Sequence, residues 1–385
     1  MNTQTAVSGR HSKMLGTQLA QALSVGLSVN DFQRLASRLS LLVDAFEVEQ
    51  NGLGFNNLIY MAVVLSELAK NPDAAFRSLI IEEPEAHLHP QLQAILLRYL
   101  ESIQTIEGER PVQLFVTSHS PNFASIAKLD CLVCMVDTGE VVQSFCPREI
   151  AFDKGKKEKL ERYLDVTRAE LFFARRVIFV EGVAELLLVS VLAEKAGFDL
   201  RQHGVSLISV EGLNFDSFLP LFGEKALRIP VAAITDADPG DDDGSGEPKL
   251  LYPARCDSVS VSANTASMKS REDKLVRVFH GLKTFEYDLA LDEPNRVCML
   301  KALKEMHPKI GVTVETAVAA AGDDAAKARE LFRGMFERPQ NNVQKGRFGQ
   351  ALAQVIADKA TSVVVPDYIL EAIKHVCGEE MATPS

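Results

Sequence analysis

The chain has 385 residues, of which 46% are hydrophobic and 24% charged, a balance that predicts a globular protein of two or three domains. Its formal net charge of −11 excludes a simple basic protein that coats DNA through bulk positive charge. No apolar run reaches the roughly 18 to 20 residues that a membrane span needs, so we expect no membrane partner. The N-terminal residues carry no apolar secretion core, and the six cysteines are too few for a disulfide framework. We therefore expect a cytoplasmic protein, with Cys131 and Cys134 as buried strand thiols.

The first 150 residues divide into a helical and a mixed part. Apolar side chains recur at three- and four-residue spacing between residues 14 and 50, which predicts that 1–50 is a helical segment. A glycine-rich stretch and a helix over 58–70 follow. A short apolar strand at 78–81, a helix over 89–104 and a second strand at 112–120 then give the strand, helix, strand order of a parallel sheet.

A charged stretch, 151–174, is expected to be a linker and contains the densest basic cluster of the chain, Lys154, Lys156, Lys157 and Lys159. A solvated helix face is the usual explanation of such a run, and a patch that contacts phosphates is the alternative. A second series of strands and helices begins at Arg175, and the pattern is mainly helical from about Leu300 onward. The expected domains are thus 51–150 and 175–385, both of the α/β class.

Residues of the first mixed part resemble elements of a nucleotide site. Glu82 and Glu83 end an apolar strand as the two Walker B acids do, where the first holds magnesium and the second orients water. His119 ends the next strand, where an imidazole can contact a γ-phosphate. Gly52 and Gly54 precede a helix and would allow the backbone to approach phosphate. In this order the set resembles the C-terminal lobe of ABC-type ATPase heads of the SMC and RecF kind.

Two departures limit what this resemblance implies. The family usually has Asp at the first Walker B position, where this chain has Glu82. No G-x-x-x-x-G-K-[ST] loop is present in the sequence, so nothing in it would cradle the β- and γ-phosphates. We therefore expect the chain to lack the N-terminal ATPase lobe, and to use ATP only together with a lobe that carries a Walker A loop.

Acids that follow two strands of the second part predict a metal site. Glu181 follows one strand, with Glu185 one helical turn later, and Asp236 and Asp238 follow another. The carboxyl ends of parallel strands share one edge of a sheet, so we expect the four acids to meet there. Clustered carboxylates repel unless a cation lies among them, and oxygen ligands favour Mg²⁺ or Mn²⁺. Glu211 could substitute for a ligand, and the acids at 241–243 are expected in a solvated loop.

The segments VEGxxE and ITDAD resemble the signature of the Toprim fold, a Rossmann-like parallel sheet, here with C-terminal helices. Toprim after an ABC-type half is similar to the OLD (overcoming lysogenization defect) family of ATP-associated endonucleases. The resemblance implies Glu181, Glu185, Asp236 and Asp238 as ligands of a two-metal site. Thr284 and Glu286 in TFEYD would complete the shell of the second metal. Lys345 in KGRFGQALA would stabilise negative charge on the phosphate or the leaving oxygen.

The implied activity is metal-dependent nicking and cleavage of DNA, in which Glu181, Asp236 and Lys345 are catalytic. The Lys154–Lys159 cluster, Arg175, Arg176 and Arg347 could follow the DNA backbone without reading sequence. A homodimer is expected because ABC heads complete their sites with the signature loop of a partner. Two alternatives stay open: a nucleotide-gated DNA-binding protein that does not cleave, and a Toprim topoisomerase or primase.

Overall fold

The computed structural model describes residues 3–15, 20–27, 39–43, 46–47, 50–70, 76–102, 112–137, 139, 141–212, 215–239 and 251–378. The chain divides into two compact units, Met1–Ala127 and Lys128–Ser385. This division differs from the expected one, because residues 128–150 and the stretch 151–174 fold with the second unit. The predicted linker is therefore part of a folded unit.

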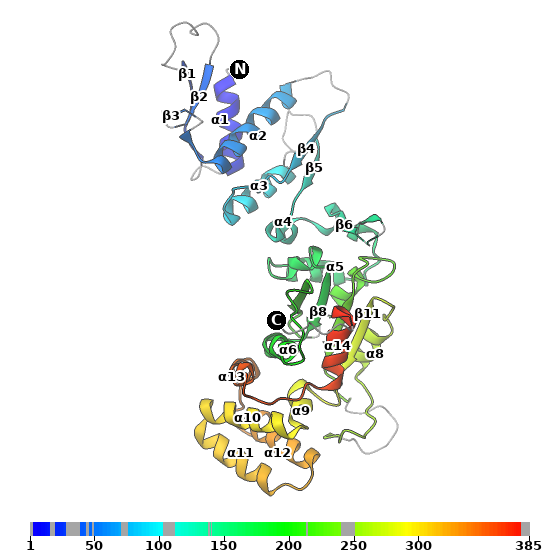
Figure 1. The fold of residues 1–385 in the computed structure, drawn as a ribbon. Helices are drawn as coiled ribbons and strands as arrows, with labels where there is room; N and C mark the ends of the chain where they lie inside the picture. The colour runs from blue at the N-terminus through cyan, green and yellow to red at the C-terminus, as the bar shows by residue number, and fades with distance from the viewer. Residues whose placement is uncertain are drawn as a thin grey trace. The chain divides into compact units, whose positions relative to one another are not determined.

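The first unit combines helices with two small sheets (Figure 1). An antiparallel sheet contains β1, β2 and β3, and β4 pairs with β5 in parallel, with Glu82 opposite Thr117. Apolar side chains from α1, α2 and α3 form its core. The elements of the first unit are α1 (Thr3–Leu15), β1 (Leu23–Leu27), β2 (Leu39–Val43), β3 (Phe46–Glu47), α2 (Leu53–Lys70), β4 (Ser78–Glu82), α3 (Pro90–Ser102), β5 (Gln113–Thr117) and α4 (Pro121–Ile126).

The prediction of helix over 14–50 is wrong in the residues that the structure describes after Leu15. The helix α1 ends at Leu15, and β1, β2 and β3 follow it. The apolar residues of 23–27 and 39–43 pair across the two strands, Leu23 with Val43 and Leu27 with Leu39. Short apolar runs fit either a helix or a strand, and pairing between distant segments decided the outcome here.

The second unit is a parallel α/β sheet with added helices (Figure 1). Its main sheet has the order β11-β10-β8-β9, with every neighbouring pair parallel, and β6 pairs with β7 in a separate antiparallel hairpin. The elements of the second unit are β6 (Cys134–Asp137), β7 (Val142–Phe145), α5 (Lys156–Tyr163), β8 (Arg176–Val180), α6 (Val183–Lys195), β9 (Val205–Ser209), α7 (Phe215–Phe218), β10 (Val231–Thr235), α8 (Ala263–Lys269), β11 (Val276–His280), α9 (Phe285–Ala290), α10 (Glu293–Met306), α11 (Pro308–Ala320), α12 (Asp324–Phe336), α13 (Lys345–Ala357) and α14 (Asp367–Cys377).

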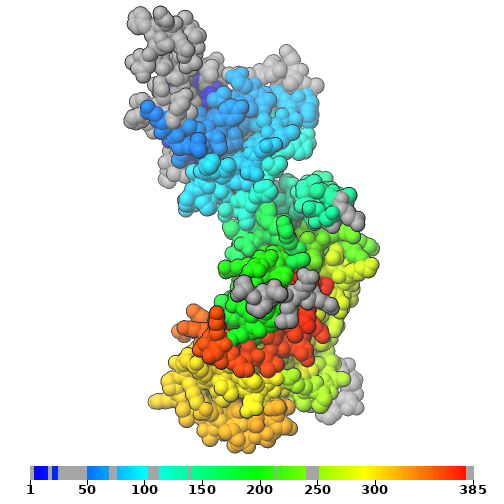
Figure 2. Space-filling model, in the orientation of Figure 1, coloured from blue at the N-terminus to red at the C-terminus, as the bar shows by residue number. Residues whose placement is uncertain are grey.

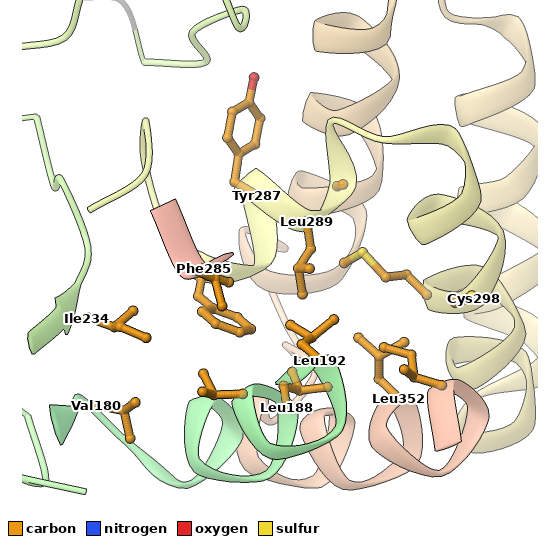
Figure 3. Packing of buried hydrophobic residues seen from close by; sticks show 14 of the residues in the cluster. Val180, Leu188, Leu192, Ile234, Phe285, Tyr287, Leu289, Cys298 and Leu352 are labelled. Atoms are coloured by element: carbon orange, nitrogen blue, oxygen red, sulfur yellow. The ribbon is translucent and has the colours of Figure 1, made fainter. Parts of the chain in front are cut away.

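Both faces of the main sheet are covered, which explains why its central strands, β8 and β10, are nearly continuous apolar runs. Ile178 and Val180 of β8 point to a core built with α6, α9 and the C-terminal helices, whereas Val177 and Phe179 point to a second core on the other face. Figure 3 shows Val180 and Ile234 of the strands with Leu188 of α6 and Phe285 of α9 in the first core. The sheet is thus a rigid central layer whose strand ends can position polar side chains.

The C-terminal helices return to the sheet. The helix α14 packs against β8, β10 and β11, and α13 packs against α6 and α10. Figure 2 shows α13 and α14 in orange and red, next to the green residues that contain β8 and α6. None of the helices in the described ranges is long and apolar enough to cross a membrane.

The two CxxC cysteines differ from the expectation of buried strand thiols. Cys131 is exposed and lies before the hairpin, whereas Cys134 is half-buried in β6. The second half of the apolar run forms β6 of a two-stranded hairpin. Exposed and half-buried side chains alternate along β6 and β7, so only one face of the hairpin is covered.

Candidate metal site and nucleotide-site elements

The parallel pairing of β8 with β10 brings two of the predicted acids into contact. Glu181 follows the last residue of β8, and Asp236 follows the last residue of β10. Oε1 of Glu181 accepts a hydrogen bond from the Thr235 hydroxyl at 2.6 Å and another from the backbone N–H of Asp236 at 2.9 Å. The carboxylate of Glu181 therefore lies across the end of the neighbouring strand, as expected for acids that follow parallel strands.

The segment after β10 is fixed by three hydrogen bonds with two neighbouring residues. The backbone carbonyl of Lys283 accepts from the N–H of Ala237 at 3.1 Å and from that of Asp238 at 3.3 Å. Oδ1 of Asp236 accepts from the N–H of Phe285 at 2.9 Å. Asp238 has a φ of +39°, in the left-handed region that most side chains avoid. Such strained backbone is common at functional sites, and here surrounding hydrogen bonds hold it.

Two helices and the start of a third supply the remaining charged groups. Glu185 of α6 and Glu286 of α9 are buried, at 8% and 1% exposure. Lys345 begins α13, and its Nζ lies 2.9 Å from Oε2 of Glu286. Oε1 of Glu286 has no hydrogen-bond partner in the described part of the chain. The close approach of α13 to α6 places Lys345 here, because a Cβ on Gly349 would lie 2.8 Å from the Cα of Ala184.

The acids of this edge experience burial and one another's charge. Burial, followed by the charge of Glu286, raises the pKa of Glu185. Burial and the charge of Glu181 raise the pKa of Asp236 well above its usual value, and the same two causes raise that of Asp238. Burial acts to lower the pKa of Lys345, but the carboxylates of Glu286, Asp236 and Glu185 outweigh it and the pKa is raised. These shifts describe a site with excess negative charge that a cation would relieve.

The residues fit a hard divalent cation in their chemistry. All the candidate donors are oxygens, and Oε1 of Glu286 is buried with no partner among the described residues, which is unfavourable unless something binds it. The geometry is not that of a finished coordination shell. Within the described ranges, no three His, Cys, Asp or Glu side chains already converge as metal ligands.

Thr284 has a local structural role. It is the N-cap of α9, and its hydroxyl accepts from the backbone N–H of Tyr287 at 3.4 Å. Such a cap satisfies one of the free N–H groups of the first helical turn and fixes where Glu286 lies. Its predicted place in the shell of a second metal is not tested by this geometry and stays a prediction.

Three contributors to this site were not singled out from the sequence. Thr235 orients Glu181 through its hydroxyl, and the backbone carbonyl of Lys283 holds the segment after β10. Tyr368 of α14 is half-buried, and burial together with the charges of Asp288 and Asp236 raises the pKa of its phenol well above the usual value. Thr235 lies inside the ITDAD segment and could have been noticed there, whereas Tyr368 has no local signal because only the packing of α14 brings it near.

The structure also describes most of the other charged residues that the sequence offers as possible ligands or phosphate contacts. Glu211 forms an ion pair with Arg168 at 2.6 Å, so its carboxylate already has a cationic partner. The acids at 241–243 lie outside the described residues. In the basic cluster, Lys156 pairs with Asp216 and Lys157 with Asp130, and Lys156 and Lys157 belong to α5. The cluster is therefore partly neutralised rather than an open positive patch.

The nucleotide-site elements of the first unit form a separate group. The N–H of Glu83 donates to the Thr117 carbonyl at 3.0 Å, which joins the ends of β4 and β5. Glu83 has a φ of +42°, and its Oε1 lies 3.5 Å from Nε2 of His119. The structure thus brings the second predicted Walker B acid next to the predicted switch histidine. Glu82, the last residue of β4, is exposed beside them.

Glu85 is a contributor to this group that sequence reasoning missed. Its Oε1 accepts from the Ser118 hydroxyl at 2.5 Å and from the N–H of His119 at 3.1 Å, so it ties the turn after β4 to the histidine loop. Gly54 lies against that turn as well, since a Cβ there would be 2.4 Å from the His87 carbonyl oxygen. Packing alone therefore requires a glycine at 54, whereas Gly52 has open space around it. A phosphate role for either glycine stays a prediction.

Comparison with family profiles matches two parts of the chain in this order. Residues 39–124 match the AAA ATPase domain, and residues 172–238 match the TOPRIM domain of overcoming lysogenization defect-like proteins. The second match includes Glu181, Glu185, Asp236 and Asp238. These matches confirm an ATPase-type region followed by an OLD-like TOPRIM domain.

Curated relatives point the same way. The "Endonuclease GajA" of Bacillus cereus (strain HuB5-5) is 26% identical, over 86% of this chain and 54% of its own length. The "OLD nuclease" of Thermus scotoductus is 27% identical, over 49% of this chain and 36% of its own length. The chain thus spans about half of the first relative and about a third of the second. A solved structure of the C-terminal region of the Xanthomonas campestris pv. campestris OLD protein is 26% identical, covers 54% of this chain and 94% of that chain, and has a TM-score of 0.36.

Proposed function

We propose that this chain, in which an OLD-like TOPRIM domain follows an ATPase-type region, is a divalent-metal-dependent endonuclease that nicks and cleaves DNA. The observation that carries the proposal is the hydrogen-bonded contact of Glu181 with the end of β10, beside buried Glu185 and Glu286. Acids in this arrangement need a cation, and divalent ions held by oxygen ligands are the usual agents of phosphodiester hydrolysis. The names of the relatives support DNA cleavage as the use of such a site.

Glu181, Glu185, Asp236, Asp238 and Glu286 would hold Mg²⁺ or Mn²⁺. When bound, such ions would lower the pKa of water and bind the scissile phosphate. The Thr235 hydroxyl and the Asp236 N–H keep Glu181 aimed at the strand edge, so less freedom is lost when an ion binds.

Lys345 is the cation that the sequence predicts for this site. In the structure its ammonium faces Glu286, and its side chain keeps 45% exposure, so it can reach a bound phosphate. A cation that moves from Glu286 to the phosphate would stabilise the negative charge that develops on the departing 3′ oxygen. The expected product therefore carries a 5′ phosphate.

A role for ATP is proposed only in combination with a Walker A loop from outside this sequence. Glu83, His119 and Glu85 form a connected group, but the sequence contains no lysine loop for the phosphates. A large rise in the melting temperature of this chain with an ATP analogue and Mg²⁺ would contradict that restriction. A homodimer also stays a proposal, since the completing loop would come from a partner.

Supercoiled plasmid incubated with Mg²⁺, Mn²⁺ or a chelator tests the proposed activity. The wild type should give nicked and then linear DNA with metal and intact plasmid with chelator, and Asp236→Asn and Lys345→Ala should each lower the rate by more than about a hundredfold. Glu185→Gln should also lose activity, whereas Glu194→Gln, an exposed acid at the other end of α6, should not. Intact plasmid with either metal would favour a protein that binds DNA without cleaving it. A ladder of topoisomers would favour the topoisomerase alternative.

A further inference from the structure

The carboxyl end of β11 lies beside the acid site and carries a histidine. The register of the parallel pair β10 and β11 places His280 opposite Thr235. Since neighbouring strands are about 4.8 Å apart, His280 is one strand away from the hydroxyl that orients Glu181. The ring of His280 therefore belongs to the same sheet edge as the acids, although no acid among the described residues contacts it.

His280 holds a lysine in place. Its Nε2 lies 3.0 Å from Nζ of Lys269, and its Nδ1 lies 2.8 Å from the carbonyl oxygen of Gly281. An ammonium group has only donors, so Nε2 accepts from Lys269 and the proton of the neutral ring is on Nδ1, where it donates to Gly281. The lysine is thus fixed by a neutral partner, and its charge is not cancelled.

Lys269 is also tied to Asp236 through its own helix. Thr265 lies four residues earlier on α8, on the same helix face, and its hydroxyl donates to the backbone carbonyl of Asp236 at 3.0 Å. One face of α8 therefore contacts the end of β10 at Thr265 and the end of β11 at Lys269. These two contacts fix α8, and with it Lys269, against the ends of β10 and β11.

Three cations of this region are paired with acids, and Lys269 is not paired with any acid that the structure describes. Lys345 pairs with Glu286, Lys283 with Glu337 at 3.7 Å, and Arg255 with Asp292. Lys269 is exposed, and among the described residues no carboxylate lies within ion-pair distance of it. On a chain with a net charge of −11, an exposed and unneutralised cation beside an acid site is a natural contact for a polyanion.

We propose that Lys269, positioned by His280, binds a backbone phosphate of the DNA strand that flanks the scissile phosphate. The inference rests on the proposed function. It adds that the DNA strand, where it continues beyond the scissile phosphate, passes over the end of β11. A lysine binds phosphate as a point charge, so this contact fixes the position of the strand and reads no sequence.

Binding of a fluorescein-labelled DNA duplex, followed by anisotropy in Ca²⁺ between about 50 and 200 mM salt, tests the contact. Lys269→Gln should raise the dissociation constant roughly threefold to tenfold and reduce the salt slope by about one. The matched control is Lys274→Gln, because Lys274 lies at the opposite end of β11, is exposed and faces Glu224 at 3.8 Å. This control should leave the salt slope unchanged.

His280→Ala separates positioning from charge. It keeps the lysine but removes its partner, so binding should weaken less than in Lys269→Gln while the salt slope stays that of the wild type. An unchanged slope in Lys269→Gln, or an equal loss in Lys274→Gln, would overturn the inference. The binding assay needs no cleavage, so the two proposals can fail separately. If Lys269→Gln reduces the salt slope but the wild type never cleaves DNA, only the proposed nuclease activity is refuted. If the wild type cleaves DNA and Lys269→Gln keeps the wild-type salt slope, only the proposed phosphate contact is refuted.

Discussion

Glu181 and Asp236 are joined directly, since a carboxylate oxygen of Glu181 accepts the backbone N–H of Asp236 at 2.9 Å. The same oxygen accepts the Thr235 hydroxyl, so one atom receives two donors from the end of the neighbouring strand. Two residues 55 positions apart in the sequence are thereby held as one unit. The other carboxylate oxygen of Glu181 has neither of these contacts and is the better placed to bind an ion.

Removal of the Thr235 hydroxyl should therefore weaken metal binding without removing any ligand. Thr235→Val keeps the shape of this buried side chain but leaves Glu181 with one donor fewer. Loss of such an orienting partner typically costs about 10- to 100-fold in metal affinity. Titration with Mn²⁺ measures the change, and Thr235→Ser, which keeps the hydroxyl, should bind within about threefold of the wild type. Equal affinities for the Val and Ser variants would show that the hydrogen bond does not matter.

Metal affinity should depend on pH in a direction that follows from the raised pKa values. Burial and neighbouring acids raise the pKa of Glu185, Asp236 and Asp238, so these groups keep protons at a pH where ordinary carboxyls have lost them. A divalent ion must displace those protons, so its apparent affinity should rise with pH, by at most about tenfold per pH unit for each proton released. Calorimetric titration at several pH values measures this, and Glu185→Gln should flatten the dependence. An affinity that falls as the pH rises would contradict the assignment of these acids.

The contact between α13 and α6 should control the position of Lys345. In Gly349→Ala the new methyl group would meet the backbone of Ala184, so α13 must move outward and carry Lys345 with it. We expect cleavage to fall more than tenfold and the free energy of unfolding to fall by about 1–3 kcal/mol. Gly346→Ala is a matched control on the same helix, because nothing lies within 4 Å of its Cβ, and it should leave both quantities nearly unchanged. Plasmid nicking and urea unfolding measure the pair, and equal behaviour of the two variants would rule out this role of the contact.

Much of this arrangement follows from the sequence. Apolar runs that end in acids predict the strands at 78–82, 176–180 and 231–235, and the shared edge of a parallel sheet predicts that Glu181 meets Asp236. The three- and four-residue spacing of apolar side chains wrongly predicts a helix after Leu15, where β1 pairs with β2 in antiparallel. The position of Tyr368 near the acids and the contact of Lys269 with His280 depend on how α14 and α8 pack on the sheet, which no local pattern records.

The first unit should lose stability in acid through a buried histidine of α1. His11 of α1 is fully buried, and the backbone of Gln21 only partly offsets that burial. Burial lowers its pKa, so the unfolded chain takes up a proton below about pH 6.5 that the folded state resists. Stability that is present above this pH is therefore lost as the pH falls, by at most about 1.4 kcal/mol per pH unit.

Hydrogen exchange of the α1 amides at about pH 7 and pH 5 measures this loss. His11→Leu, which cannot titrate, should protect α1 more than the wild type does at the lower pH. The exposed His87→Asn should show no such difference from the wild type. If the wild type and His11→Leu lose protection equally on acidification, another group is responsible.

Direct counting of bound ions tests the central claim that acids at neighbouring strand ends gather divalent cations. Equilibrium dialysis of the chain against Mn²⁺ at about pH 8 should find two ions per wild-type chain, fewer in Asp236→Asn, and two in Glu194→Gln. Wild-type protein that binds no Mn²⁺, or Asp236→Asn that binds as much as the wild type, would contradict the account.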